Sequence, residues 1–424
     1  MTIPPLSYDE AASLDTADPL SKVREKFEIP LNKNGGEQAY FAGNSLGLLP
    51  KQTRQTMQTA LDQWGKKGVA GHFDGTEAWY RFDEVVSELQ TDLIGSSPSE
   101  TGVMGNLTSN LHVLMASFYQ PTKLRKKILI EPHAFPSDRY AVSSQILWHG
   151  GDPVSDIVVI EPEKPDEVTP ADLERTIAEH GDTICLALIG GVNYYTGQFI
   201  DISKFASVLQ DKEIIFGLDL AHAVGNVPLE LHNWNIDFAA WCTYKYLNGG
   251  PGSISGYFVH EKHHNDNELV RLAGWWGNDP DTRFDMHGQD TFIPRRSADG
   301  WKASNPSLFA MVPVKTSLEI FNEIGIKNLR ERSIQLTNYF ERGVDLLDGA
   351  SSITPRDPKR RGCQISVRVT GNASQLEHEL IERGVVPDAR DPDVLRFAPT
   401  PLYTRFTDIA KAIDELDQVL SKKK

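Results

Sequence analysis

Short apolar runs alternate with amphipathic helical patterns over residues 127–241. The runs are continuous rather than alternating, which is typical of strands that are covered on both faces of a parallel sheet. Between two of them, Ile202, Phe205 and Leu209 fall on one face of a predicted helix. Repeated strand and helix signals predict a mostly parallel sheet with right-handed crossovers. The apolar runs are 128–130, 157–160, 184–189 and 214–218.

After residue 301 the pattern changes. Long helices are predicted over 317–347, followed by a strand at 364–369, a helix at 375–383 and a last helix. We therefore expect an α/β protein in which residues 51–305 form a large domain with a mostly parallel sheet covered by helices. Residues 306–424 are expected to form a smaller C-terminal α/β domain.

The charge of the chain excludes two classes of partner. The 424 residues include 43 Lys and Arg against 58 Asp and Glu, a formal net charge of −15. A negative surface repels a phosphate backbone or an anionic membrane. We therefore expect neither nucleic acid nor a membrane as a partner.

The cysteines and the N-terminus favour a cytoplasmic protein. Cys185, Cys242 and Cys363 lie far apart without a CxxC pair, so neither a disulfide framework nor a zinc knuckle is predicted. Residues 1–18 lack the basic and apolar parts of a signal peptide. The longest apolar stretch, 184–192, is about half of the ~20 residues that span a membrane.

Two short motifs suggest chemistry that their context disfavours. His260 to His264 matches the HExxH zinc motif, but it follows a predicted strand, which favours a solvated turn and no metal. Gly43 to Gly47 matches the GxSxG motif of a nucleophilic serine, but no long strand precedes it. Pro50 stands where the required helix would begin.

Three other positions form a more consistent set. Residues 105–110 form a Gly-led turn into a helix, which predicts an anion site or, alternatively, a Thr or Ser helix cap. Asp219 ends an apolar strand, with His222 three residues later; the alternative is a capping Asp and a buried His. Lys245 ends a predicted strand over 237–246, where partial burial can lower the pKa of an amine.

Together these positions favour a pyridoxal phosphate enzyme. Pyridoxal phosphate requires a group for its phosphate, one for its ring nitrogen and one for its aldehyde carbon. An anion-binding helix start, the strand-end Asp219 and the strand-end Lys245 supply all three.

Longer strings then show a resemblance to the kynureninases, pyridoxal phosphate enzymes of fold type I in the class V aminotransferase-like branch. The strings run in order from about residue 40 to residue 403, and their length makes a chance match improbable. They are FAGNSLGLLP (41–50), NLTSNLH (106–112), FPSD (135–138), YTGQ (195–198), DLAHAVGN (219–226), YKYLN (244–248), GWWG (274–277), SNP (304–306) and RFAPTPLY (396–403).

The resemblance implies hydrolysis of the Cβ–Cγ bond of L-kynurenine or L-3-hydroxykynurenine, releasing an anthranilate and L-alanine in tryptophan catabolism or NAD biosynthesis. It implies that Lys245 forms the Schiff base and carries the α-proton, Asp219 pairs with the pyridine nitrogen, and Tyr244 is catalytic and contacts the phosphate. Trp275 is implied to come from the other subunit of a homodimer with a shared active site. The implied cofactor-binding residues are Leu107, Thr108, Phe135, Pro136, Ser137, Asp138, Asp219, His222, Tyr244, Lys245, Trp275 and Asn305.

The resemblance also implies a substrate site. Arg396 corresponds to the arginine that clamps the α-carboxylate, and His72, Ser304 and Asn305 surround the aromatic ring. This polar set favours 3-hydroxykynurenine. Residues 1–50 are expected to contribute to the active site and the small domain.

The sequence departs from the family pattern at one position, and there are three alternatives to the implied function. Gly190 stands where family members often carry Ser or Thr, so a side-chain cofactor contact is absent there. An aminotransferase shares the fold, as does a cysteine desulfurase, which would need a nucleophilic cysteine on a mobile loop. A non-catalytic pyridoxal phosphate-binding protein would be expected to lose Lys245 or Arg396, and both are present.

Overall fold

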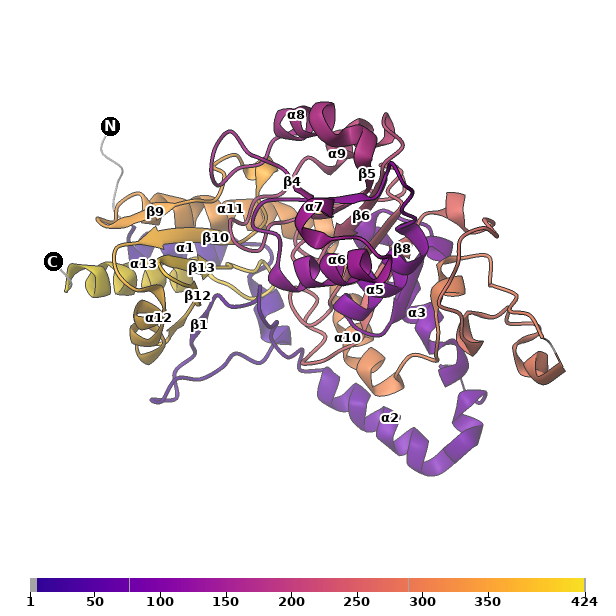
Figure 1. Cartoon of the computed structure of the whole chain (residues 1–424). Helices are drawn as coiled ribbons and strands as arrows, with labels where there is room; N and C mark the ends of the chain where they lie inside the picture. Colours follow the sequence, from indigo (N-terminus) through magenta and orange to yellow (C-terminus); the bar gives the residue numbers. More distant parts are fainter. Residues whose placement is uncertain (1–5, 76, 289, 423–424) are drawn as a thin grey trace.

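The computed structural model describes residues 6–75, 77–288 and 290–422, so the first five residues of the expected N-terminal segment lie outside it. A seven-stranded sheet forms the centre of the molecule (Figure 1), with the strand order β2-β8-β7-β6-β5-β3-β4. Strand β8 is antiparallel to both of its neighbours, and the other pairs are parallel. The strands are β2 (Thr101–Met104), β3 (Lys127–Ile130), β4 (Ile157–Val159), β5 (Ile184–Gly190), β6 (Ile215–Asp219), β7 (Phe238–Trp241) and β8 (Ser255–Val259).

The apolar runs are confirmed as strands β3, β4, β5 and β6, but the strand predicted over 237–246 is shorter. Strand β7 ends at Trp241, and the chain then turns so that the Gly249 N–H donates to the Thr243 carbonyl at 2.8 Å. The prediction of a strand-end lysine is therefore wrong in detail. Lys245 lies in this turn, beyond the end of the sheet.

Helices cover both faces of the sheet because successive side chains of a strand point to opposite faces. Ile128 and Ile130 pack with α5 and α6, whereas Leu129 packs with α8, α9 and α10. The helix predicted from Ile202 and Phe205 is confirmed as α9. The helices of this part are α2 (Thr53–Lys67), α3 (Phe82–Glu88), α4 (Thr91–Ile94), α5 (Leu107–Phe118), α6 (Pro136–Trp148), α7 (Pro153–Asp156), α8 (Pro170–His180), α9 (Ile202–Gln210) and α10 (Leu308–Ile324).

A second, antiparallel sheet has the order β12-β13-β10-β9, and helices pack on it around a separate hydrophobic core. The helices and the strand predicted after residue 301 are confirmed here. The strands are β9 (Ala350–Ser352), β10 (Ile365–Val369), β12 (Asp388–Arg390) and β13 (Val394–Phe397), and the helices are α1 (Tyr8–Ala17), α11 (Ile326–Val344), α12 (Ala373–Glu382) and α13 (Phe406–Ser421).

The two cores do not divide at residue 305. Helix α10 follows that position, yet its Val314 and Leu318 belong to the core of the large sheet. The domain boundaries stay a prediction. No helix within the described residues is long and apolar enough to cross a membrane.

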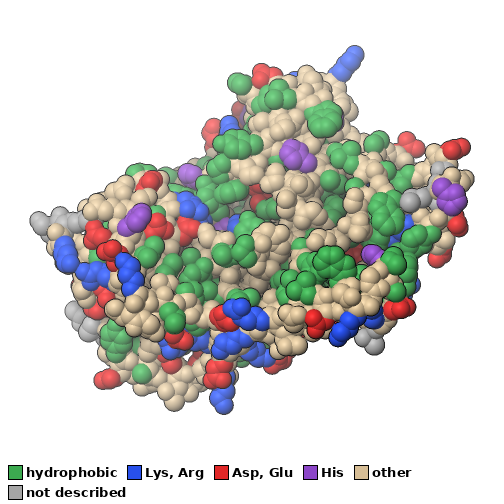
Figure 2. All heavy atoms as spheres, turned by 90° about the horizontal axis from the view of Figure 1, so that it is seen from below, with side chains coloured by type: hydrophobic (Ala, Val, Ile, Leu, Met, Phe, Trp, Pro, Cys, Tyr) green, Lys and Arg blue, Asp and Glu red, His purple; other side chains and the backbone are tan. Residues whose placement is uncertain are grey.

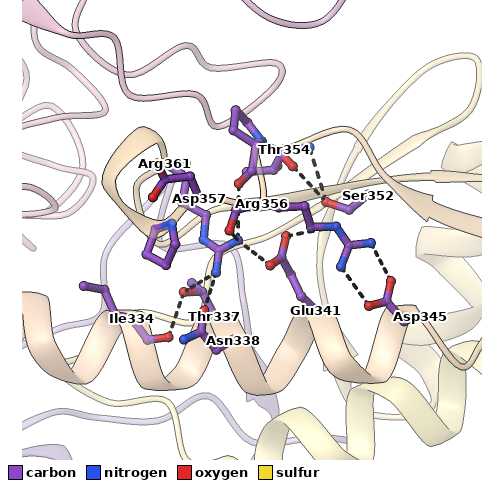
Figure 3. Close-up of polar contacts among 12 residues, drawn as sticks. Ile334, Thr337, Asn338, Glu341, Asp345, Ser352, Thr354, Arg356, Asp357 and Arg361 are labelled. Carbon is purple, nitrogen blue, oxygen red and sulfur yellow. Dashed lines mark hydrogen bonds and ion pairs between the residues drawn. The ribbon is translucent and has the colours of Figure 1, made fainter. Parts of the chain in front are cut away.

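A loop that follows β9 ties the second sheet to the first part of the chain. Arg361 is fully buried and pairs with Glu341 of α11, and its Nη2 donates to the Asn338 side chain at 2.6 Å (Figure 3). Next to it, the Gly362 N–H donates to the Gly197 carbonyl at 3.2 Å. This loop therefore holds the segment after β5 against the second sheet.

The N-terminal segment contributes one strand of a separate two-stranded sheet. β1 (Ala39–Tyr40) pairs in parallel with β11 (Val385–Val386). Further along, the Gly47 N–H donates to the Tyr244 carbonyl at 2.8 Å. A Cβ at Gly47 would lie 2.2 Å from the Lys245 carbonyl oxygen, so only glycine permits this approach. The GxSxG string thus packs against the turn that carries Lys245.

Candidate active site

A cavity of about 370 Å³ opens at the carboxyl ends of β5 and β6. Strands of an open α/β sheet place ligands at this edge. Eight of the predicted cofactor-binding residues line the cavity: Leu107, Thr108, Phe135, Asp138, Asp219, His222, Tyr244 and Lys245.

One wall is the start of α5. Asn106 is the N-cap, and its side chain accepts from the Ser109 N–H at 3.3 Å, so the alternative of a Thr or Ser cap is wrong. Thr108 is left to bond with Ser137, the two hydroxyl oxygens being 3.0 Å apart. Free N–H groups, the helix dipole and two hydroxyls together suit a phosphate.

A second wall follows Ile130. Phe135 immediately precedes α6, which begins at Pro136, and its ring lies 5.1 Å from the Tyr194 ring in an edge-to-face contact. The Lys245 Nζ lies 5.7 Å from the centre of the Phe135 ring. Phe135 therefore presents an aromatic surface beside the amine.

Lys245 has an unusual partner. Its Nζ lies 3.0 Å from Nε2 of His222, a side chain only 5% exposed. Burial lowers the pKa of His222 far below its ordinary value, and the positive charge of Lys245 adds to this effect. His222 is therefore neutral, and its Nε2 accepts a hydrogen bond from the amine.

Three carboxyl groups, those of Glu131, Asp138 and Asp219, line the same cavity. The Asp219 Oδ1 accepts the Ala221 N–H at 2.7 Å, so Asp219 bonds within its own turn and caps no helix. Burial raises the pKa of Asp138 well above its ordinary value, and the neighbouring Asp219 raises it further. Burial also raises the pKa of Glu131 to about 7. This wall is rich in acid and short of positive charge.

The acid-rich wall fits a protonated pyridine nitrogen. Asp138 is 6% exposed, and its Oδ1 has no hydrogen-bond partner. A buried polar atom without a partner is costly, and a ligand N–H would satisfy it. The cavity therefore offers donors for a phosphate, an aromatic surface, acceptors for a ring N–H and an amine, as pyridoxal phosphate requires.

Arg396 lies next to the cavity rather than in its lining. The guanidinium is 5.9 Å from the centre of the Tyr194 ring, and its Nη1 donates to the Tyr194 carbonyl at 2.7 Å. Tyr194 itself lines the cavity. Strand β13 thus brings the predicted carboxylate clamp to the cavity rim.

Two predicted residues lie apart from the cavity in this chain. His72 is exposed at the end of a short 3-10 helix (Gly68–His72), with its ring 5.3 Å from that of Trp79. Trp275 begins another short helix (Trp275–Gly277), where its ring lies 4.8 Å from that of Trp276. Neither side chain lines the cavity.

Ser304 and Asn305 line a second hollow of about 520 Å³. Both residues are exposed, and this hollow also includes Ser109 of α5. Gly252 lines both the hollow and the main cavity, so the two are adjacent. Ser304 and Asn305 therefore lie near the start of α5, beside the main cavity.

Sequence reasoning missed Glu131 and Tyr194. Glu131 directly follows an apolar strand, so the rule that strand ends carry ligands could have found it. Its Oε1 accepts the Gly190 N–H at 3.1 Å, and a Cβ at Gly190 would lie 2.8 Å from that oxygen. The carboxyl thus occupies the space beside Gly190. No comparable signal marked Tyr194, which lies in a loop.

The HExxH string does not form a helical zinc motif. Only a short 3-10 turn, Glu261–His263, follows β8. The His260 Nδ1 accepts the Lys262 N–H at 3.2 Å, and the His264 Nε2 contacts the Val259 carbonyl at 3.0 Å. The two histidines are therefore held by separate backbone groups.

Comparison with known proteins supports the same assignment. Residues 329–416 match the kynureninase C-terminal domain. The chain is 48% identical to a kynureninase of Salinispora tropica, with 97% of each chain covered. It is 44% identical to a kynureninase of Xanthomonas campestris, over 98% of this chain and 99% of the relative.

The fold has solved counterparts at lower identity. The structure of an apo cysteine desulfurase from Thermococcus onnurineus superposes with a TM-score of 0.77 at 18% identity, covering 95% of this chain and 98% of the other. This similarity confirms the predicted fold, that of fold type I pyridoxal phosphate enzymes. The identity and coverage shared with the curated relatives show that the chain belongs to the kynureninase family.

Proposed function

We propose that the Lys245 cavity is where this chain binds pyridoxal phosphate and hydrolyses the Cβ–Cγ bond of L-kynurenine or L-3-hydroxykynurenine. The products are anthranilate or 3-hydroxyanthranilate and L-alanine. The observation that carries the proposal is the amine of Lys245, 3.0 Å from a neutral His222 and facing an acid-rich wall.

Each wall has a role in holding the cofactor. The start of α5, with Leu107 and Thr108, and the phenol of Tyr244 bind the phosphate. Phe135 stacks on the ring, and Asp219 with Asp138 accepts from the ring nitrogen. When bound, pyridoxal phosphate supplies an electron sink for the carbanion formed at the substrate α-carbon.

The chain's own groups move the protons. The Lys245 amine would hold the cofactor and would take the α-proton of a bound substrate. His222 is neutral and accepts a hydrogen bond from this amine, which orients it. The pKa of Tyr244 is raised by burial, so its phenol stays protonated and can serve as the acid during hydration of the ketone.

Arg396 binds the α-carboxylate of the substrate. It lies on the cavity rim, and a guanidinium offers paired donors for a carboxylate. This contact would orient the amino acid so that its amine reaches the cofactor and its aromatic ring points away from β13.

A homodimer completes the site. His72 and Trp275 lie apart from the cavity of their own chain, and the surface around them exposes large apolar side chains, including Val69 (80% exposed), Phe73 (60%) and Phe284 (53%). Figure 2 views the molecule from the side of α2 and shows hydrophobic side chains gathered on this face. Such patches mark protein interfaces. A two-fold partner would bring His72 and Trp275 to the other cavity.

The polar set around the substrate ring favours the hydroxylated substrate. His72, Ser304 and Asn305 can all hydrogen-bond to a ring hydroxyl, which adds about 1–3 kcal/mol where the geometry is right. We expect a higher kcat/KM for 3-hydroxykynurenine. A cytoplasmic location is proposed because all three cysteines are free.

A cysteine desulfurase activity is disfavoured by the cysteines themselves. Burial raises the pKa of Cys242 and Cys185, and it raises that of Cys363 to about 12. None of the three lines the cavity. A reactive cysteine requires an accessible thiol with a lowered pKa.

The test is direct. Purified protein with pyridoxal phosphate should be yellow, and borohydride should bleach it and attach the cofactor to Lys245, as a peptide map would show. Added kynurenine should give anthranilate fluorescence and an equal amount of alanine. Label at another lysine, or yellow protein that forms neither anthranilate from kynurenine nor 3-hydroxyanthranilate from 3-hydroxykynurenine, would refute the proposal.

A further inference from the structure

The predicted carboxylate clamp is itself held by a second set of residues. Arg396 is only 1% exposed. In the second sheet it lies directly opposite Asp388, because β12 and β13 are antiparallel and these two residues are paired in register. Cross-strand partners lie on the same face of a sheet, so the carboxylate and the guanidinium must meet.

Arg396 contacts Asp388 through a single oxygen of the carboxylate. The Arg396 Nε donates to Oδ1 of Asp388 at 3.1 Å, and the Nη2 lies 2.7 Å from the same oxygen. The Nη1 donates to the Tyr194 carbonyl. A guanidinium carries five N–H donors, so donors on Nη1 and Nη2 remain for a ligand.

Asp388 is fixed in turn. Its other oxygen, Oδ2, accepts from the Ser45 hydroxyl, and Arg390 pairs with Oδ1 at 2.5 Å. Ser45 belongs to the N-terminal segment, which runs beside the second sheet through the parallel bridge between Ala42 and Ala398. The Asp388 side chain is only 12% exposed and therefore has little freedom to turn.

We propose that Asp388 is a positioning residue: held by Ser45, it orients the Arg396 guanidinium so that its free donors receive the α-carboxylate of an amino acid. The inference rests on the proposed role of Arg396. It gives the GxSxG serine a positioning task, and it ties recognition of the carboxylate to the N-terminal segment. The ligand class is amino acids with a free α-carboxylate.

The test compares ligands with and without that carboxylate on the holoenzyme. In Asp388→Ala, the dissociation constant of L-alanine, followed by the absorbance of the bound cofactor, should rise about tenfold, whereas that of L-alaninamide should change less than about twofold. The KM for kynurenine should rise about as much, with kcat within about threefold. Asp388→Asn keeps an acceptor and should recover most of the affinity, and Ser45→Ala should show a smaller rise.

Two further variants make the result decisive. Asp393 pairs with Arg368 at 3.4 Å on the same sheet, so Asp393→Asn is the matched control and should leave both dissociation constants unchanged. Arg396→Gln should lose L-alanine binding. If it does while Asp388→Ala binds L-alanine as well as or better than the native enzyme, the positioning role is wrong and the role of Arg396 stands. If Arg396→Gln binds L-alanine normally, the proposed role of Arg396 fails as well.

Discussion

Lys245 and Lys302 lie in the same half of the molecule, but their amines have opposite surroundings. The Lys302 side chain is fully buried, and its Nζ lies 2.6 Å from a carboxylate oxygen of Asp83 and 2.6 Å from one of Asp299. The Lys245 Nζ contacts the neutral His222, and within the described residues no carboxylate forms an ion pair with it. The charge of the Lys302 amine is neutralised by the protein, whereas the Lys245 amine is available to a ligand.

The difference teaches what distinguishes a structural lysine from a reactive one. Burial alone lowers the pKa of Lys302, but Asp299 and Asp83 outweigh it and raise that pKa. Lys302 therefore stays charged and cannot act as a nucleophile. The carboxylates that line the cavity with Lys245 can pair with the ring of a cofactor instead. The groups that contact a lysine, rather than its burial, decide whether it is structural or reactive.

The largest effect is expected from Lys245→Ala. With the proposed roles of this amine in binding the cofactor and moving a proton, anthranilate release should fall at least about 10³-fold, with a small change in melting temperature. Lys204→Ala, an exposed lysine paired with Asp201, is the control. Turnover within tenfold of the native enzyme would contradict the assignment.

Lys302→Ala should have the opposite pattern, with a large loss of stability. It leaves Asp83 as a buried carboxylate without its cation, whereas Asp299 keeps its ion pair with Arg295 at 3.0 Å. Breaking a buried pair by removing one partner costs about 3–5 kcal/mol of unfolding free energy. Urea denaturation measures this loss. Lys26→Ala breaks an exposed pair with Glu323 and should cost less than about 1 kcal/mol. An equal cost for the two variants would remove the contrast.

The acid-rich wall predicts a pH-dependent effect for Glu131→Gln in protein without pyridoxal phosphate. The pKa of Glu131 is raised from 4.5 to about 7, so in the native protein stability present below pH 4.5 is lost as the pH rises through 7. The loss is at most about 3 kcal/mol. The variant should therefore be more stable than the native protein at pH 8 and nearly equal at pH 4.

Thermal unfolding at both pH values checks this sign. Glu174→Gln changes an exposed carboxyl and should leave the difference between the two pH values unaltered. A Glu131→Gln protein that is less stable than the native one at pH 8 would show that the carboxyl is stabilised by its surroundings.

The smallest effect on binding is expected from Tyr244→Phe, apart from the loss of turnover that follows from removing the proposed acid. Loss of one phenol donor should weaken pyridoxal phosphate binding about five- to tenfold, equivalent to about 1 kcal/mol. Equilibrium dialysis of the cofactor gives the value. Tyr140→Phe, at a residue 70% exposed on α6, should leave the affinity unchanged. Unchanged affinity in Tyr244→Phe would remove the phenol from the phosphate site.

Local patterns predicted the parts of the fold that depend on local chemistry. Strand β6, with Asp219 at its end, and helix α9 could both be predicted from the sequence. A strand buried on both faces gives a continuous apolar run, and a helix buried on one face gives apolar residues at helical spacing. The turn after β7 was not, because it depends on the close approach of Gly47 to the Lys245 carbonyl from a distant segment. Glu131 follows an apolar strand, so a local signal for it was present, but its contact with Gly190 of β5 depends on the packing of the sheet.

The sequence by itself determined the α/β architecture, the lysine, the acid at 219 and the family. The spacing of apolar residues and the sequence strings shared with the family carry that information. Only the tertiary structure decided that His222 is the partner of the amine, that Asp138 and Glu131 share its cavity, and that Asp388 holds Arg396. These pairings join residues far apart in the chain. The burial of these groups and the interactions between their charges arise only once the sheets have packed.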